Sequence, residues 1–205
     1  MSKCYWITGL SASGKTTLST LLVDYLRSEG RKVIRLDGDE LRQVLADEAY
    51  TREERIALGM RYSRLCQLIV SQDIDVVIAV IGLFKELHEW NRSNICGYTE
   101  VFISVPLDEL KKRDPKGLYM KYKNGEINNI AGMDLKIDYP KNPDICLKWS
   151  DGQSAGSMLQ ELIELIIQFE NESENSLNVY NRKRCWHYIH ELQNDTYFGK
   201  FISFQ

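Results

Sequence analysis

Hydrophobic positions along the chain alternate between the pattern of buried strands and that of amphipathic helices. Short, largely apolar runs predict strands at 5–8, 32–36, 75–81, 100–105 and 144–149. Between them, apolar residues recur at helical spacing over 18–26, 58–69 and 159–169, and more weakly over 86–94 and 107–112. Strands that alternate with helices are typical of an α/β domain built on a parallel sheet.

A glycine-rich stretch joins the first predicted strand to the first predicted helix. It matches G-x-x-x-x-G-K-[ST], the phosphate-binding P-loop, in the order strand, loop, helix that this motif requires. Its backbone N–H groups and the helix N-terminus attract an anion, Lys15 reaches the β/γ-phosphates, and Thr16 is placed to bind Mg²⁺. A chance glycine-rich turn is the alternative, and the flanking strand and helix favour ATP binding. The predicted nucleotide contacts are Gly9, Ser11, Ala12, Ser13, Gly14, Lys15, Thr16 and Thr17.

Acidic residues follow the second predicted strand. Asp37 and Asp39 flank Gly38, and Arg42 comes one helical turn later. The carboxyl ends of parallel strands border the ligand crevice of an open α/β sheet, whereas Asp-Gly is also a common surface turn. We favour ligand binding because the acids, Arg42 and the P-loop would then face one cleft.

The segment 113–143 is polar, without a clear period, and too long for an ordinary connection. Its basic residues Arg113, Lys116, Lys121 and Lys123 suit a lid that closes over phosphates, and a simple loop is an equal alternative. Earlier in the chain, Thr51 and Glu54 have the spacing of a capping box at a helix start.

Composition limits the class of protein. The 205 residues, with a formal net charge of −3, suit one α/β domain and argue against a nucleic-acid polymer as the main partner. Neither a membrane span nor a signal peptide is evident, and the five scattered cysteines are typical of reduced thiols, so we expect a cytoplasmic protein. The last part, 171–205, is rich in aromatic residues and should pack on the domain or on a partner subunit. There, His187 and His190 are interpreted as structural.

Taken together, three stretches resemble adenylylsulfate (APS) kinases: the P-loop, Leu36-Asp37-Gly38-Asp39-x-x-Arg42, and the stretch from Asp114 to Tyr119 that reads D-P-K-G-L-Y. Tyr139-Pro140 to Pro143 extends the likeness, which covers roughly 3–170. The resemblance implies a P-loop NTPase fold with a five-stranded parallel sheet, and ATP-dependent phosphorylation of a nucleotide's ribose 3′-hydroxyl. It also implies Mg²⁺, a mobile lid and a homodimer. We therefore expect a kinase domain over 1–170 and an extension over 171–205.

The resemblance assigns roles residue by residue. Lys15 and Asp39 would be catalytic, with Asp39 acting on the 3′-hydroxyl and holding Mg²⁺ together with Thr16. Arg113 would join the P-loop in binding ATP. The acceptor would be bound by Asp37, Asp39, Arg42, Tyr50, Arg55, Ile81, Lys116, Leu118 and Ile130.

The chain also departs from the family at several positions. Gly82 stands where the family has a phosphorylatable serine, which predicts direct, in-line transfer. Leu58 replaces an asparagine and Met60 an arginine, while Ile130 replaces the aromatic ring that stacks on adenine, and Ala131 follows it. These changes remove adenine contacts but leave ATP binding and the chemistry intact.

The sequence therefore predicts a kinase with APS as its leading acceptor. A cytidine diphosphoramidate kinase of capsule modification is the close alternative, because a pyrimidine offers less surface to stack. A nucleotide-binding module without catalysis is a more distant one.

Overall fold

The sheet has five parallel strands, as predicted, in the order β2-β3-β1-β4-β5. The structure is a computed structural model, which describes residues 1–47 and 49–176. Its strands span Cys4–Thr8 (β1), Val33–Asp37 (β2), Asp75–Val80 (β3), Tyr98–Ser104 (β4) and Ile145–Lys148 (β5). Every predicted strand is present, with ends shifted by one or two residues.

Burial explains why the strands read as apolar runs. Every residue of β1 and β3, the two central strands that pair from Cys4↔Val76 to Thr8↔Val80, is buried. Helices cover both faces of these strands, so alternation of polar residues is not possible there. In β5, which pairs only with β4 among the described residues, burial alternates.

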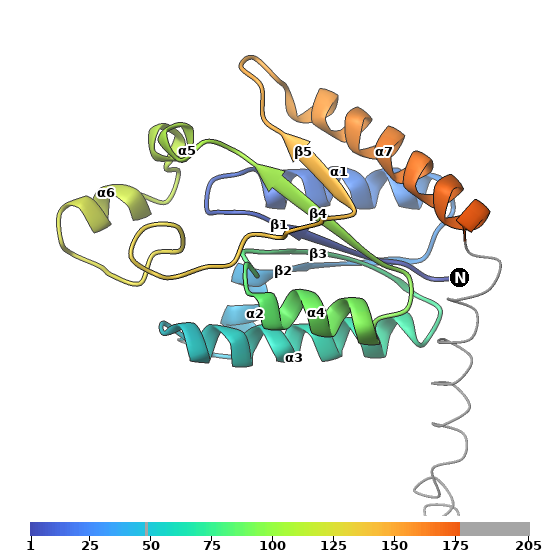
Figure 1. The fold of residues 1–205 in the computed structure, drawn as a ribbon, viewed down its shortest axis with the longest axis horizontal. Helices are drawn as coiled ribbons and strands as arrows, with labels where there is room; N and C mark the ends of the chain where they lie inside the picture. The colour runs from blue at the N-terminus through green and yellow to red at the C-terminus, as the bar shows by residue number, and fades with distance from the viewer. Residues whose placement is uncertain (48, 177–205) are drawn as a thin grey trace, which may run out of the picture. The chain divides into compact units, whose positions relative to one another are not determined.

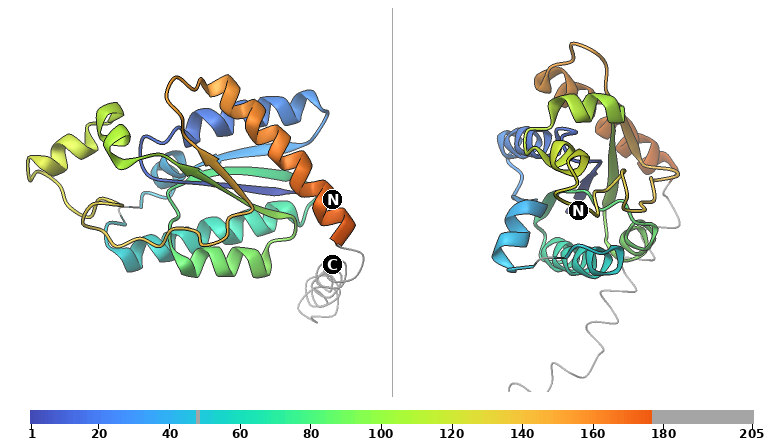
Figure 2. Two further views of the ribbon diagram at one scale, coloured as in Figure 1. Left: turned by 45° about the horizontal axis from the view of Figure 1, so that its top comes forward. Right: turned by 90° about the vertical axis from the view of Figure 1, so that its left-hand side faces the viewer.

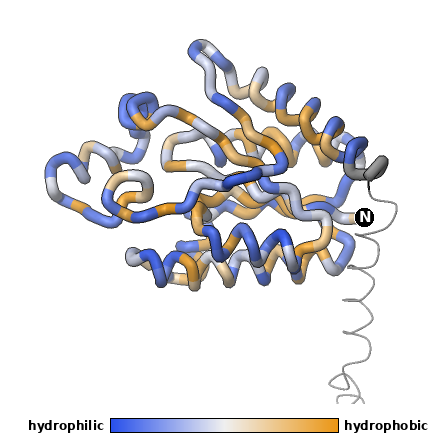
Figure 3. The backbone as a smooth tube through the Cα atoms, viewed as in Figure 1, coloured by the Kyte–Doolittle hydropathy of each residue, from blue (hydrophilic) through white to orange (hydrophobic). Residues whose placement is uncertain are grey.

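The helices lie in layers on the two faces of the sheet (Figure 1). On one face α1 contacts β1, β2 and β3, while on the other α3 and α4 pack on each other and on β3 and β4. Apolar segments of the tube concentrate in the strands and on the inner sides of these helices (Figure 3). The helices span Lys15–Ser28 (α1), Gly38–Val44 (α2), Arg52–Val70 (α3), Lys85–Asn94 (α4), Leu107–Arg113 (α5), Leu118–Lys123 (α6) and Ala155–Ser176 (α7).

Local signals set the ends of two of these helices. α1 ends with Gly30 at φ 76°, where Arg31 N donates to Leu26 O in a Schellman arrangement. The capping box predicted at the start of α3 is present, since Thr51 and Glu54 bond to each other's backbone N–H groups.

Two details differ from the sequence-based expectation. The segment 113–143 contains α6, which at six residues is too short to show a helical period. In α3, the predicted apolar stripe is rotated: Leu68 is 58% exposed, whereas Cys66 and Val70 face the core. Gly59 and Ser63 lie on the buried side of α3, and at Gly59 a Cβ would collide with Leu87 of α4, so the two helices approach each other closely there. α5 and α6 lie together beyond the carboxyl end of β4 (Figure 2).

The chain divides into two compact units, Met1–Leu165 and Ile166–Gln205. Helix α7 begins in the first and continues into the second. Of the predicted extension 171–205, only 171–176 is described, so His187, His190 and the aromatic residues lie outside the described part. Across residues 1–47 and 49–176, none of the helices combines the length and the apolar character that a membrane span needs.

Candidate active site at the carboxyl ends of the strands

The P-loop connects β1 to α1 and leaves the first turn of α1 without a side-chain cap. A side chain at Gly9 would place its Cβ 2.9 Å from Ile103 O, so only glycine fits there. Gly14 is the N-cap residue of α1, with φ 94° and no side-chain hydrogen bond. Uncapped N–H groups at the positive end of a helix are a binding site for phosphate.

Lys15 points its ammonium group into this loop. Its Nζ donates to Leu10 O at 2.7 Å and lies 3.5 Å from Ser13 Oγ. Burial lowers the pKa of Lys15 to about 8. The positive charge of Lys116 also lowers this pKa, whereas the carboxylates of Asp39 and Asp37 raise it. A phosphate group at this position would stabilise the charged lysine and raise the pKa again.

Asp37 and Thr16 bring oxygen atoms together beside the lysine. Asp37 is buried at the end of β2, where its Oδ2 accepts from Thr16 Oγ1 at 2.8 Å and its Oδ1 caps α2 by accepting from Asp39 N at 2.9 Å. A hydroxyl and nearby carboxylates are ligands that Mg²⁺ prefers, so these residues fit the predicted ion. Residues 1–47 and 49–176 contain no cluster of three or more His, Cys, Asp or Glu that could hold a metal.

These groups open onto a cleft of about 820 Å³, a size typical of small-molecule sites. It collects side chains from the P-loop, the end of β2, helices α2 and α3, the end of β3, and the segment 113–118. Most of the predicted site residues line it: Ser11, Ala12, Gly14, Lys15, Thr16, Thr17, Asp37, Asp39, Arg42, Arg55, Ile81, Arg113, Lys116 and Leu118. Their predicted roles remain predictions, but their shared location is established.

Arg42 and Arg55 supply positive charge away from the P-loop. Arg42 Nη1 donates to Ala49 O at 2.9 Å, and Arg55 donates to Tyr50 O and Asn129 O at 3.0 and 2.9 Å. Burial lowers the pKa of Arg55, and the charge of Arg42 lowers it further. Within the described residues neither arginine forms an ion pair with a carboxylate, so both charges remain available to an anionic ligand.

The segment 113–143 reaches the cleft through Lys116, which forms an ion pair with Asp39. Leu118, the first residue of α6, also lines the cleft. Arg113 bonds to Glu109 at 3.0 Å and lies over the Trp149 ring, so its guanidinium is already engaged.

Four predicted residues do not line the cleft. Gly9, which leaves no room for a Cβ, and Ser13, which is buried, belong to the P-loop itself. Tyr50 is 57% exposed, and its backbone holds Arg55 and the capping box. The backbone N–H of Ile130 donates to Asp134 Oδ1 at 2.7 Å, which fixes this part of the segment 113–143. Tyr50 and Ile130, of which Ile130 stands at the position of the family's adenine-stacking ring, thus do not line the cleft in this structure.

Several lining residues were missed from the sequence, above all Trp6, Tyr62 and Phe84. Trp6 and Tyr62 fall within a predicted strand and a predicted helix, Phe84 lies in the loop after the third predicted strand, and all three are buried. One signal was available for Tyr62. It lies one helical turn after Leu58, the position at which the resemblance expects an asparagine that contacts the acceptor.

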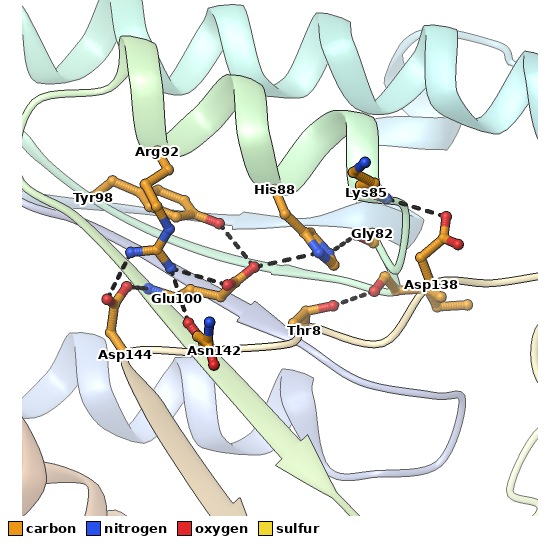
Figure 4. Close-up of polar contacts among 11 residues, drawn as sticks. Thr8, Gly82, Lys85, His88, Arg92, Tyr98, Glu100, Asp138, Asn142 and Asp144 are labelled. Atoms are coloured by element: carbon orange, nitrogen blue, oxygen red, sulfur yellow. Dashed lines mark hydrogen bonds and ion pairs between the residues drawn. The ribbon is translucent and has the colours of Figure 1, made fainter.

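The loop after β3 forms part of the cleft wall and is held from behind (Figure 4). Thr8 Oγ1 donates to Ile81 O, and His88 Nε2 donates to Gly82 O at 2.9 Å. Gly82 has φ 47°, and a Cβ there would lie 3.1 Å from Trp6 Nε1. This φ strongly favours glycine at position 82, and a Cβ there would also be in tight contact with Trp6 and Val80.

Behind this loop lies a network around Glu100, a buried residue of β4 (Figure 4). Arg92 Nη2 contacts one carboxylate oxygen at 3.1 Å, Tyr98 OH donates to the other at 3.4 Å, and His88 Nδ1 lies 3.8 Å away. Arg92 also pairs with Asp144 at 2.7 Å. The network links α4, β4 and the start of β5.

The comparisons with known proteins agree with this geometry. The family model described as adenylylsulphate kinase matches residues 1–148. The cytidine diphosphoramidate kinase of Campylobacter jejuni is 37% identical over 163 residues, covering 80% of this chain and 93% of that protein. A probable adenylyl-sulfate kinase of Halalkalibacterium halodurans is 37% identical over 177 residues, covering 83% and 85%.

A solved structure shares the fold. The Mycobacterium tuberculosis APS kinase CysC, in complex with AMPPNP and APS, superposes with a TM-score of 0.74 at 34% identity, covering 80% of this chain and 97% of that one. The relatives thus include two kinds of kinase that differ in the acceptor nucleotide.

Proposed function

Because the chain belongs to the adenylylsulphate kinase family, we propose that it transfers the γ-phosphoryl group of ATP directly to the ribose 3′-hydroxyl of a nucleotide-activated small oxyanion. The observation that carries this proposal is that Lys15 and Asp39 line one cleft together with Arg42 and Arg55. One end of the cleft suits the phosphates of ATP, and the other suits an anionic acceptor.

Phosphoryl transfer mainly needs positioning and neutralisation of charge, and the cleft offers both. The P-loop amides and Lys15 would hold the β/γ-phosphates. Thr16, Asp37 and Asp39 would hold Mg²⁺, which supplies charge neutralisation when bound. Lys116 would leave its ion pair with Asp39 and bind the phosphates instead. The Asp39 carboxylate would then orient the acceptor hydroxyl and accept its proton.

Adenylyl sulfate is the acceptor expected from the family as a whole. Its phosphosulfate end carries the negative charge that Arg42 and Arg55 could neutralise. Relatives named adenylyl-sulfate kinase support this acceptor at 37% identity or less.

A second acceptor, cytidine diphosphoramidate, is favoured by a specific observation. Leu58 offers no hydrogen bond to a base, and neither Tyr50 nor Ile130 lines the cleft. An apolar slot of this kind discriminates weakly between bases, by roughly 1–3 kcal/mol per missing contact. The relative from Campylobacter jejuni is named for this substrate, and the chain covers nearly all of that protein's length.

The two acceptors are distinguished by the ratio of their specificity constants on one enzyme preparation. We expect ADP release with both acceptors and at most a weak preference for adenylyl sulfate. A preference of about a thousandfold would mean that other residues rebuild adenine recognition, and the cytidine acceptor would be abandoned. Absence of turnover with either acceptor, while ATP still binds, would favour a nucleotide-binding module without catalysis.

We also propose a cytoplasmic homodimer. The cytoplasm is supported by the free thiols of Cys4, Cys66 and Cys146. The dimer rests on the resemblance alone, and sedimentation of the full chain tests it.

A further inference from the structure

Two polar atoms in the wall of the cleft lack a hydrogen-bond partner among residues 1–47 and 49–176. The indole Nε1 of Trp6 and the hydroxyl of Tyr62 are both without one, although the side chains are 0% and 5% exposed. Both residues line the cleft. Buried polar groups are nearly always hydrogen-bonded, so atoms of this kind in a ligand cleft indicate that the ligand is their partner.

Missing partners alone would not make this argument. Ser63 follows Tyr62 on α3, is fully buried, and also has an unpaired hydroxyl, but it does not line the cleft. Among the aromatic residues of the described chain, only Trp6 and Tyr62 both line the cleft and carry a buried polar atom without a partner.

Both atoms belong to the acceptor side of the cleft. Tyr62 lies one helical turn after Leu58 on α3, and the charges of Arg42 and Asp39 act on its hydroxyl. Trp6 Nε1 lies against Gly82, in the loop after β3. The P-loop contacts neither of these atoms through a hydrogen bond.

We propose that the Tyr62 hydroxyl and the Trp6 N–H recognise the base of the acceptor nucleotide, a proposal that rests on the kinase function above. Because the indole N–H can only donate, the group it meets must carry an acceptor atom, such as a carbonyl oxygen or an unprotonated ring nitrogen. The Tyr62 hydroxyl can donate or accept. Adenine and cytosine both carry such acceptor atoms, so the two contacts would hold either base without separating the two acceptors strongly.

Burial raises the pKa of Tyr62 above its ordinary value, so the hydroxyl keeps its proton at neutral pH. The groups around it are Arg42 and Arg61, which oppose the shift, and Asp47 and Asp39, which add to it. The hydroxyl therefore remains able to donate over the range in which kinases are assayed.

The test is Tyr62→Phe, which removes the hydroxyl and keeps the ring. We expect kcat/KM for the preferred acceptor, adenylyl sulfate or cytidine diphosphoramidate, to fall about five- to tenfold through a higher KM, the loss of one hydrogen bond. The KM for ATP should change less than twofold. Trp6 is fully buried and its substitution alters packing as well, so Tyr62→Phe carries the test.

Ser63→Ala is the matched control, because it removes a neighbouring buried and unpaired hydroxyl outside the cleft. It should leave both KM values unchanged. An equal KM for the acceptor in Tyr62→Phe and wild type would overturn the proposal, as would an equal rise in Ser63→Ala.

Calorimetry separates this proposal from the proposed function. Each acceptor is titrated into wild type and Tyr62→Phe with a non-hydrolysable ATP analogue present. Weaker acceptor binding by the variant supports recognition by Tyr62 even if wild type shows no turnover. Equal binding, or no binding of either acceptor to wild type, overturns it.

Discussion

Asp37 and Glu100 are both buried carboxylates, but their surroundings differ. Glu100 meets Arg92, Tyr98 and His88, and Asp144 joins the same network by accepting from the backbone N–H of Glu100 at 2.7 Å. Among residues 1–47 and 49–176, Asp37 accepts only from a hydroxyl and a backbone N–H, and its ion-pair partner Arg35 lies 3.7 Å away. A carboxylate that the protein neutralises itself is structural, whereas one left with spare acceptor capacity beside a cleft can serve a ligand.

This difference separates two regions of the domain. Around Glu100 the polar groups satisfy one another and fix the loop after β3. Around Asp37, groups such as Lys15 and Asp39 line the cleft, where the proposed function places phosphates and metal. Substitutions near Glu100 should therefore affect stability, and substitutions in the cleft should affect activity.

The largest effect is expected for Lys15→Ala. Loss of the phosphate-neutralising charge should lower kcat by about a thousandfold or more. Stability should be equal or higher, because the cost of partly desolvating an ammonium group is removed. Steady-state kinetics and thermal unfolding measure the two effects, with Lys123→Ala, an exposed lysine of the same segment as Lys116, as control. Near-normal turnover by a folded Lys15→Ala variant would contradict the kinase mechanism.

Asp39→Asn should lower kcat by about a hundredfold while leaving ATP affinity within a few-fold of wild type. The amide keeps the shape but loses the charge and the ability to accept a proton. The control is Asp108→Asn, at a carboxylate that is 93% exposed. If ATP affinity fell sharply while saturated turnover held, Asp39 would be a binding residue only.

The opposite pattern is expected for Arg92→Met. Removal of this cation leaves Glu100 buried and poorly neutralised, which should reduce the free energy of unfolding by about 2 kcal/mol. This is less than the ~3–5 kcal/mol of a fully buried pair, because Arg92 is partly exposed. Urea denaturation measures the loss, Arg92→Lys should recover part of it, and kcat should change little. Unchanged stability would show that the network around Glu100 does not support the loop.

The smallest effect is a dependence of ATP affinity on pH. The pKa of Lys15 is lowered to about 8, so raising the pH from 7 to 9 should weaken ATP binding by at most about tenfold. Binding near pH 8 should take up protons, which calorimetry in buffers of different ionisation enthalpy detects.

The same shift has a defined sign for stability. Between pH 8 and 10.5 the unfolded chain binds more protons at Lys15 than the folded chain, so this group's contribution to stability rises with pH. A fall in the stability of wild type between pH 8 and 10.5, measured relative to Lys15→Ala, would show that the pKa of Lys15 is not lowered.

The strands and the P-loop were predictable because their signals are local. Strands buried on both faces must be apolar, and the motif around Lys15 has a fixed spacing. Most of the cleft followed as well, since the ends of parallel strands meet at one edge of the sheet. Helix α6 was not predictable, because one and a half turns show no period.

Trp6 and Tyr62 were missed for a different reason. A buried aromatic residue has the same sequence pattern whether its polar atom faces the core or a cleft. Only the three-dimensional arrangement shows that these two atoms lack partners. The rotated stripe of α3 depended on packing too, because Gly59 and Ser63 face inward and Leu68 does not.

Gly82 has a consequence for the stereochemistry of the reaction. Position 82 has no hydroxyl, and a side chain there would be in tight contact with Trp6. The phosphoryl group therefore cannot rest on this residue between donor and acceptor. A single in-line displacement inverts the configuration at phosphorus, whereas two successive displacements restore it. With ATP made chiral at its γ-phosphorus by oxygen isotopes, the 3′-phosphorylated product should have the inverted configuration.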